Sequence, residues 1–160
     1  MHSTCCDRML RALIWDVDGT VAETERDGHR VAFNRAFAEA GLDWFWEVQN
    51  YGLLLQVAGG RERLLAFMQQ HPGAPSGAAE QDRLARALHA RKNILYAEQV
   101  AQGHIQARPG VRRLMDECRR EGVALAVATT TSTSNLQALF SSLFGEAWRE
   151  RFAAVVCAED

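Results

Sequence analysis

Three short apolar runs along the chain are typical of buried β-strands. They cover residues 10–15, 123–128 and 152–158. Each run has the length of a strand and ends in polar or turn-forming residues, so the pattern predicts strands rather than helices. Strands of this kind, apolar on both faces, are usual inside parallel sheets.

Between these runs, apolar residues recur three and four positions apart, which is the spacing of amphipathic helices. The spacing predicts helices over residues 29–40, 43–55, 61–70, 79–101, 111–120 and 135–143. Four of these helices directly follow the first strand, and a β-α-β pattern fills the last third of the chain. We therefore expect an α/β protein with an α-helical insertion after the first strand of its core.

Composition changes this picture little. Of the 160 residues, 48% are hydrophobic and 24% are charged, which supports a true core and one or two small domains. The net charge of −2 gives no indication of nucleic acid or an anionic membrane as the main partner. No apolar run approaches the roughly 20 residues that span a bilayer.

The four cysteines form neither a zinc-binding nor a disulfide pattern. Cys5 and Cys6 are adjacent, and no pair has C-x-x-C spacing. We therefore expect a cytoplasmic protein, and we expect it to be a monomer. Residues 1–8 lack the apolar stretch of a signal peptide and are expected to form a disordered polar tail, with Met9 as an alternative start.

Two carboxylates follow the first predicted strand, in the run from Asp16 to Thr20 (Asp-Val-Asp-Gly-Thr). Asp16 and Asp18 can both point into the crevice at the carboxyl end of a parallel sheet, where open α/β folds bind ligands. The alternative is an ordinary Asp-Gly turn. The position after a strand and before a helix favours the functional interpretation.

These residue types suit phosphoryl transfer. One carboxylate can attack phosphorus, and a second can protonate the leaving oxygen and later activate water. Mg²⁺, which prefers oxygen ligands, would offset the repulsion between carboxylate and phosphate. After the second predicted strand, the hydroxyl of Thr129 and the backbone of Thr130 could hold phosphate oxygens. The alternative for this Thr/Ser run is a polar loop with helix-capping residues.

With these motifs in hand, the chain resembles the haloacid-dehalogenase-like phosphatases, and within them the CbbY group. The resemblance covers residues 9–160. It rests on these segments: Asp16–Glu25, His29-Arg30, Ala32-Phe33-Asn34, Asp43–Trp46, Gly59–Arg63, Arg108-Pro109-Gly110 and the Val-Ala-Thr-Thr-Thr-Ser run at 127–132.

The resemblance implies a Rossmann-like core of residues 9–24 and 104–160 and a helical cap of residues 25–103. It implies a Mg²⁺-dependent sugar-phosphate phosphatase that converts xylulose-1,5-bisphosphate, an inhibitor of Rubisco in the Calvin cycle, to xylulose 5-phosphate. Asp16 would be the nucleophile and Asp18 the general acid/base, both at the metal. Thr129 and Thr130 would bind the transferring phosphoryl group.

Further residues on the cap side become candidates for substrate binding: Glu25, His29, Tyr51, Gly60, Arg61 and Arg63. Glu25 and His29 could instead lie on a helix surface, and Tyr51 could be a partly buried aromatic residue. Arg61 could simply pair with nearby acids. The aromatic run Trp44–Trp46 is expected in the core of the cap.

The chain departs from the family pattern in four ways. Trp15 stands where a phenylalanine is usual. Arg61 stands where a lysine is usual, and one residue is inserted between Glu25 and His29. The family's Lys-Pro loop and paired acids, which would follow the equivalent of Glu159-Asp160, are absent; Lys92 is the only lysine. We therefore expect a core that is incomplete at its C-terminus, weak Mg²⁺ binding and poor activity. A phosphosugar mutase and a non-catalytic sugar-phosphate-binding remnant are the alternatives.

Overall fold

A three-stranded parallel sheet lies at one end of the structure, a computed structural model that describes residues 10–159. Its strands are β1 (Ala12–Trp15), β2 (Ala124–Ala128) and β3 (Ala154–Val156), in the spatial order β1-β2-β3. The predicted α/β class and Rossmann-like parallel sheet are therefore confirmed. The predicted tail of residues 1–8 lies outside the described residues.

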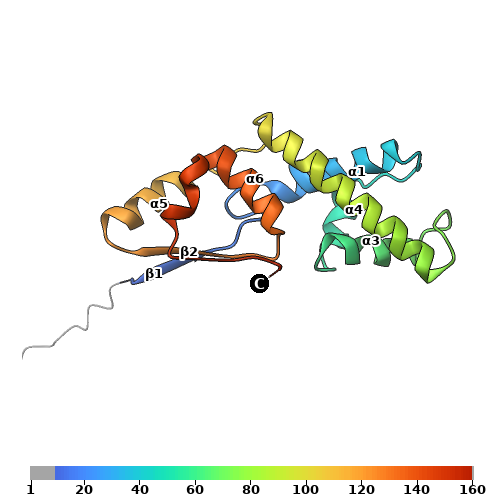
Figure 1. Cartoon of the computed structure of the whole chain (residues 1–160), viewed down its shortest axis with the longest axis horizontal. Coiled ribbons are helices and arrows are strands. Elements are labelled where there is room, and N and C mark those ends of the chain that lie inside the picture. Colours follow the sequence, from blue (N-terminus) through green and yellow to red (C-terminus); the bar gives the residue numbers. More distant parts are fainter. Residues whose placement is uncertain (1–9, 160) are drawn as a thin grey trace, which may run out of the picture.

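The helices fall into two groups along the chain (Figure 1). We call residues 25–101 the helical part and the remaining described residues the α/β part. The helical part contains η1 (Glu25–His29), α1 (Arg30–Glu39), α2 (Val48–Leu54), α3 (Gly60–Met68) and α4 (Ala78–Ala101). The α/β part contains α5 (Val111–Arg120), α6 (Thr133–Phe144) and η2 (Glu146–Arg151). η2, a 3₁₀-helix, was not predicted from the sequence.

Only one face of the sheet is covered within the described residues. Figure 1 shows α5 and α6 on the same side of the strands. On that side the paired residues Trp15 and Val127 are buried, whereas Ile14, on the opposite side of β1, is 67% exposed. Leu10 is also exposed and precedes the strand. The prediction of a fully buried strand over residues 10–15 was therefore wrong for the second face.

The helix predicted from Asp43 begins only at Val48. The side-chain amide of Asn34 accepts a hydrogen bond from the Trp46 backbone N–H and donates one to its carbonyl oxygen, at 2.8 and 3.0 Å. These bonds take the place of helical ones. Burial then alternates as in a strand: Trp44 and Trp46 are buried and Phe45 is 61% exposed. The expectation that this run lies in the core is correct for both tryptophans and wrong for Phe45.

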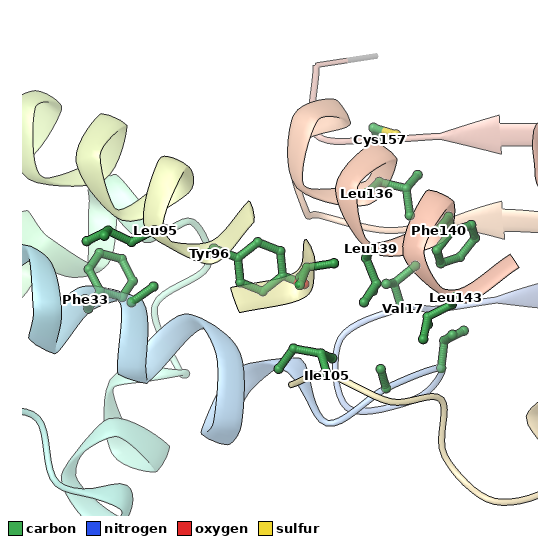
Figure 2. Packing of buried hydrophobic residues seen from close by; sticks show 14 of the residues in the cluster. Val17, Phe33, Leu95, Tyr96, Ile105, Leu136, Leu139, Phe140, Leu143 and Cys157 are labelled. Atoms are coloured by element: carbon green, nitrogen blue, oxygen red, sulfur yellow. The ribbon is translucent and has the colours of Figure 1, made fainter. Parts of the chain in front are cut away.

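A continuous apolar core joins the helical part to the α/β part (Figure 2). Phe33 and Leu95 lie on the helical side, and Leu139 lies on the other. Tyr96 and Ile105, both buried, fill the space between. α4 packs against α1, α3 and α6, so this long helix links the two parts. Among the described residues, none of the helices has the length and apolar character needed to cross a membrane.

Neighbouring aromatic residues provide a test of this packing. Trp46 is 1% exposed and contacts the rings of Phe33, Phe37, Tyr51 and Phe67. We expect Trp46→Ala to lower the free energy of unfolding by about 3–5 kcal/mol, because it leaves a large cavity. Phe45→Ala, the matched control, should cost less than about 1 kcal/mol because that ring is in solvent. The free energy of unfolding is measured by urea unfolding. An equal loss in Trp46→Ala and Phe45→Ala would contradict the alternating burial of these residues.

Candidate active site

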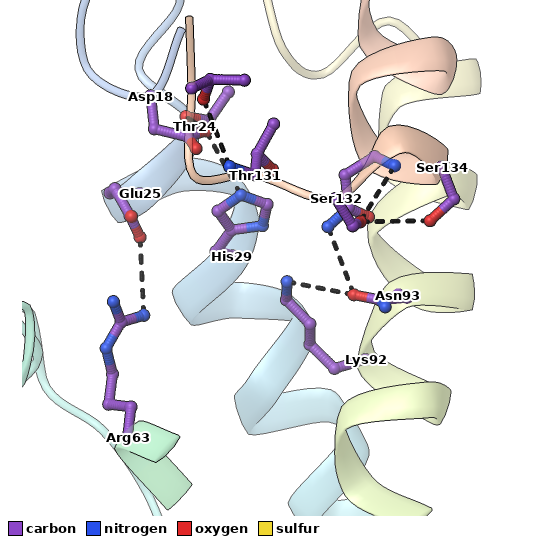
Figure 3. Close-up of polar contacts among 12 residues, drawn as sticks. Asp18, Thr24, Glu25, His29, Arg63, Lys92, Asn93, Thr131, Ser132 and Ser134 are labelled. Atoms are coloured by element: carbon purple, nitrogen blue, oxygen red, sulfur yellow. Dashed lines mark hydrogen bonds and ion pairs between the residues drawn. The ribbon is translucent and has the colours of Figure 1, made fainter. Parts of the chain in front are cut away.

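The carboxyl ends of all three strands open into one cleft of about 200 Å³, between the sheet and the helical part. This is the edge at which parallel α/β sheets bind ligands. Figure 3 shows the polar side chains that meet there. The cleft is lined by Asp18, Glu25, His29, Gly59, Gly60, Glu62, Arg63, His89, Lys92, Thr130, Thr131, Ser132, Asn135, Ala158 and Glu159.

Asp18 is held by two side chains from the helical side. The Thr24 hydroxyl donates to Asp18 Oδ1 at 2.5 Å, and His29 Nε2 lies 3.3 Å from the same oxygen. Burial by itself raises the pKa of Asp18, but the His29 contact, the Thr24 hydroxyl and the Lys92 charge outweigh it and lower the pKa overall. Asp18 is therefore ionised at neutral pH.

His29 is neutral in this arrangement. It is 3% exposed, and its ring lies 4.2 Å from that of Tyr96. Burial, and then the positive charge of Lys92, lower its pKa. A neutral imidazole can still donate its Nε2–H to Asp18, and this leaves Nδ1 as an acceptor without a hydrogen-bond partner among the described residues.

A π-turn forms directly before Arg30, at the place where the resemblance predicts one inserted residue. In η1 the Arg30 N–H donates to the Glu25 carbonyl, so the first turn holds one residue more than an α-helical turn. Gly28 lets this turn pack closely against α4, since a Cβ there would lie 2.8 Å from the Tyr96 ring. The helix predicted from residue 29 therefore starts with this turn, and Glu25 and His29 both line the cleft.

Glu25 is tied to two of the other predicted substrate residues. The Tyr51 hydroxyl donates to Glu25 Oε2 at 2.6 Å and accepts from Arg63 Nη1 at 2.9 Å. Arg63 also donates to the carbonyls of Leu54 and Val57. Tyr51 is 2% exposed and does not line the cleft. Tyr51 thus positions Glu25 and Arg63, which do line it.

Lys92 brings a buried positive charge to the cleft. Its side chain is 3% exposed, lies over the rings of Phe33 and Tyr96, and donates to Asn93 Oδ1 at 3.3 Å. Asn135 from α6 donates to the same Asn93 oxygen. Burial lowers the pKa of Lys92 to about 8, although Asp18 and Glu25 act in the opposite direction.

Two core residues that the sequence singled out are not among the residues that line the cleft. Asp16 is exposed, accepts from the Thr20 hydroxyl at 3.3 Å, and is not among the lining residues. Thr129 is half-buried, and its hydroxyl accepts from the Thr131 N–H at 3.2 Å. Thr130 lines the cleft directly. The Thr/Ser run also caps a helix, because Ser132 accepts from the Asn135 N–H at the start of α6.

Gly60 and Arg61 begin α3 but lie differently. Gly60 lines the cleft, whereas Arg61 does not and instead pairs with Asp82 and Glu62. The pairing with nearby acids, which the sequence left open for Arg61, is therefore what the structure has. The cations that line the cleft are Arg63 and Lys92.

Sequence reasoning missed several residues in and around the cleft. It gave no role to Thr24, which holds Asp18, or to His89, Lys92 and Asn135. The three-residue spacing of His89 and Lys92 on a predicted helix was an available signal, since it places both on one face. Nothing in the sequence pointed to Thr24, because its role depends on how the chain crosses from the sheet to η1.

The charges that line the cleft indicate whether a phosphate ester would need a metal ion beside it. Among the described lining residues, four carboxylates (Asp18, Glu25, Glu62 and Glu159) face two cations, Arg63 and Lys92. A phosphate ester would meet excess negative charge here unless a further cation offset it. Within residues 10–159 no group of three or more His, Cys, Asp or Glu side chains could hold a metal. Asp16 and Asp18 alone are a pair of hard oxygen donors, which fits Mg²⁺ that keeps several waters.

Comparison with known families identifies the fold. The model of the haloacid dehalogenase-like hydrolases matches residues 10–160. The chain belongs to the haloacid dehalogenase-like hydrolases. This haloacid dehalogenase-like chain has the parallel sheet and helices of that family, as the resemblance at Asp16–Thr20 predicted.

The most similar relatives include CbbY proteins. The chain is 46% identical over 146 residues to the plasmid-encoded protein CbbY of Cupriavidus necator, covering 91% of this chain and 57% of that protein. It is 41% identical over 151 residues to protein CbbY of Cereibacter sphaeroides, covering 94% of this chain and 63% of that protein. The chain thus spans about three fifths of the length of these relatives.

Solved structures agree with the sequence comparison. A mutant of CbbY from Rhodobacter sphaeroides in complex with xylulose-(1,5)bisphosphate matches with a TM-score of 0.83 and 40% identity. The match covers 94% of this chain and 64% of that one. The same CbbY in complex with phosphate matches equally well.

Lys92 makes the stability of the chain depend on pH. Its pKa of about 8 in the folded chain lies below the ordinary value of 10.5, so between these values the unfolded chain binds more protons. Stability therefore rises with pH across this window. From about pH 7.5 to 9.5, the free energy of unfolding should rise by about 2 kcal/mol relative to Lys92→Met. The free energy of unfolding is measured by urea unfolding at each pH. The same pH dependence in the unsubstituted chain and in Lys92→Met would contradict the burial of the ammonium group.

Proposed function

We propose that this chain carries part of a Mg²⁺-dependent sugar-phosphate phosphatase whose substrate is xylulose-1,5-bisphosphate. The observation that supports it best is the cleft, where the ionised Asp18 faces the cations Arg63 and Lys92. Such a cleft can receive a phosphate ester at the sheet and a second anionic group at the helical part. The likeness to CbbY in complex with that bisphosphate supports the choice of substrate.

In the proposed reaction, a carboxylate oxygen of Asp16 attacks phosphorus and the bond from phosphorus to the sugar oxygen breaks. The sugar oxygen takes a proton from Asp18, which leaves an aspartyl phosphate and the sugar product. Water then attacks phosphorus, gives its proton to Asp18 and releases inorganic phosphate. Asp16 is regenerated at the end of the cycle.

The hydrogen-bond partners of Asp18 affect its proposed roles as general acid and general base. In the described arrangement the Thr24 and His29 hydrogen bonds favour the ionised form, which suits the base that activates water. Donation to the leaving oxygen requires a protonated carboxyl group, which those two bonds disfavour. We therefore infer that substrate loosens these contacts when it binds.

Mg²⁺ would be held by Asp16 and by Asp18, whose Oδ1 is engaged by Thr24 and His29. When bound, it supplies positive charge that offsets the repulsion between Asp16 and the phosphate oxygens. The backbone of Thr130 and the hydroxyl of Thr129 are proposed to contact the remaining phosphate oxygens.

The helical part is proposed to act as a cap that binds the far end of the substrate, as the resemblance predicts for residues 25–103. Arg63 and Lys92 are the cations best situated for a second phosphate, because both line the cleft. Glu25 and His29 face the same space and are proposed to contact the sugar. Tyr51 is proposed to act through its bonds to Glu25 and Arg63. Gly60 remains a substrate candidate because it lines the cleft, and Arg61 remains one only if substrate draws it from Asp82.

The nucleophile can be tested directly. With Mg²⁺ and xylulose-1,5-bisphosphate, the chain should release inorganic phosphate at a low rate, in line with the poor activity expected from the sequence. After rapid acid quench, it should carry a phosphoryl group on Asp16 by mass spectrometry. Asp16→Asn should lower phosphate release by at least about a thousandfold, because the amide is a poor nucleophile, while still binding the bisphosphate.

Glu23→Gln is a suitable control, since this side chain contacts Arg108 outside the cleft. Unchanged turnover in Asp16→Asn would remove the nucleophile assignment. Phosphate transferred to another hydroxyl of the sugar, rather than released, would identify a mutase instead. Binding of the bisphosphate with no phosphoryl transfer by the unsubstituted chain would indicate a binding protein.

A further inference from the structure

His89 lines the cleft but has no role in the proposed reaction. It lies on α4 one turn before Lys92, so both side chains emerge from the same face of the helix. The imidazole is half-buried, in contrast to the fully buried Lys92. His89 therefore stands nearer to solvent than Lys92 does.

The imidazole of His89 is held in place by close contact with the start of α3. A Cβ at Gly60 would lie 2.9 Å from both Cδ2 and Nε2 of His89, and 3.2 Å from Cζ of Phe33. A side chain at position 60 would therefore require the ring to shift. The ring edge is packed against the first turn of α3.

The surroundings of His89 keep it uncharged. Burial, and then the positive charge of Lys92, lower its pKa to about 4. The other charged or titratable groups that act on it are Glu62, which opposes the shift, and His29 and Arg61, which add to it. At neutral pH the ring is a hydrogen-bonding group without charge, and it suits a hydroxyl or carbonyl oxygen better than a phosphate.

We propose that His89 determines specificity by hydrogen bonding an uncharged oxygen, a hydroxyl or carbonyl, on the carbon chain of the sugar phosphate. Arg63 and Lys92 hold the anionic end of the same molecule. This division of roles rests on the proposed function. It deepens that function by assigning recognition of the sugar, as distinct from its phosphates, to one residue of α4.

The test compares two ligands of the same length and charge that differ in their oxygens. Xylulose-1,5-bisphosphate carries hydroxyls and a carbonyl, and pentane-1,5-diol bisphosphate carries none between its phosphates. Binding is measured by calorimetry in the Asp16→Asn variant, which does not turn the sugar over. Adding His89→Ala should weaken the sugar bisphosphate about tenfold, as expected for one lost hydrogen bond, and change the pentanediol compound less than about twofold.

Two variants separate recognition from a general effect on the fold. His89→Asn, which keeps a hydrogen-bonding side chain, should recover part of the lost affinity. His104→Ala, at an exposed histidine outside the cleft, should leave both affinities unchanged.

The outcomes distinguish failure of the role given to His89 from failure of the proposed function. Equal weakening of both ligands by His89→Ala, or no weakening of either, would overturn the role of His89 while leaving the proposed function intact. Failure of the Asp16→Asn parent to bind the sugar bisphosphate would overturn the proposed function together with this inference.

Discussion

The burial of Lys92 between the two parts of the molecule is the constraint on which the cleft depends. An ammonium group removed from water is costly unless negative charge or aromatic rings lie close to it. Here Phe33 and Tyr96 lie beneath the charge, and Asp18 and Glu25 act on it from across the cleft. The requirement to balance one buried cation therefore links α4 with η1 and with the end of β1.

The same charge determines which neighbouring groups are ionised. It lowers the pKa of both His29 and His89, so the two histidines are neutral hydrogen-bonding groups, while it helps to keep Asp18 ionised. The charge of Lys92 thus helps to determine which side chains of the cleft are ionised and which are neutral. This separation matches a substrate whose phosphates are anionic and whose carbon chain is not.

The sequence predicted the sheet and most helices because their signals are local. The helix over residues 111–120 was predicted with the bounds that α5 has, since apolar spacing and Gly122 define it. The start of α2 could not be predicted, because two hydrogen bonds from Asn34, twelve residues before Trp46, keep that stretch extended. The exposed face of β1 was missed for a similar reason. An apolar run indicates that a strand tends to be buried, but it does not show whether other elements pack against both faces of that strand.

Asp16 and Asp18 could be proposed as site residues from the sequence because they follow a strand in a short motif, but their surroundings could not be predicted. Thr24, Tyr51 and Lys92 act through contacts that exist only once η1, α2 and α4 pack together. Arg61 and Arg63 show the limit most clearly: they are two residues apart in one motif, yet helical geometry turns the first toward Asp82 and the second into the cleft. Because residues two apart on a helix do not share a face, a motif with both arginines can supply only one of them to a ligand without rearrangement.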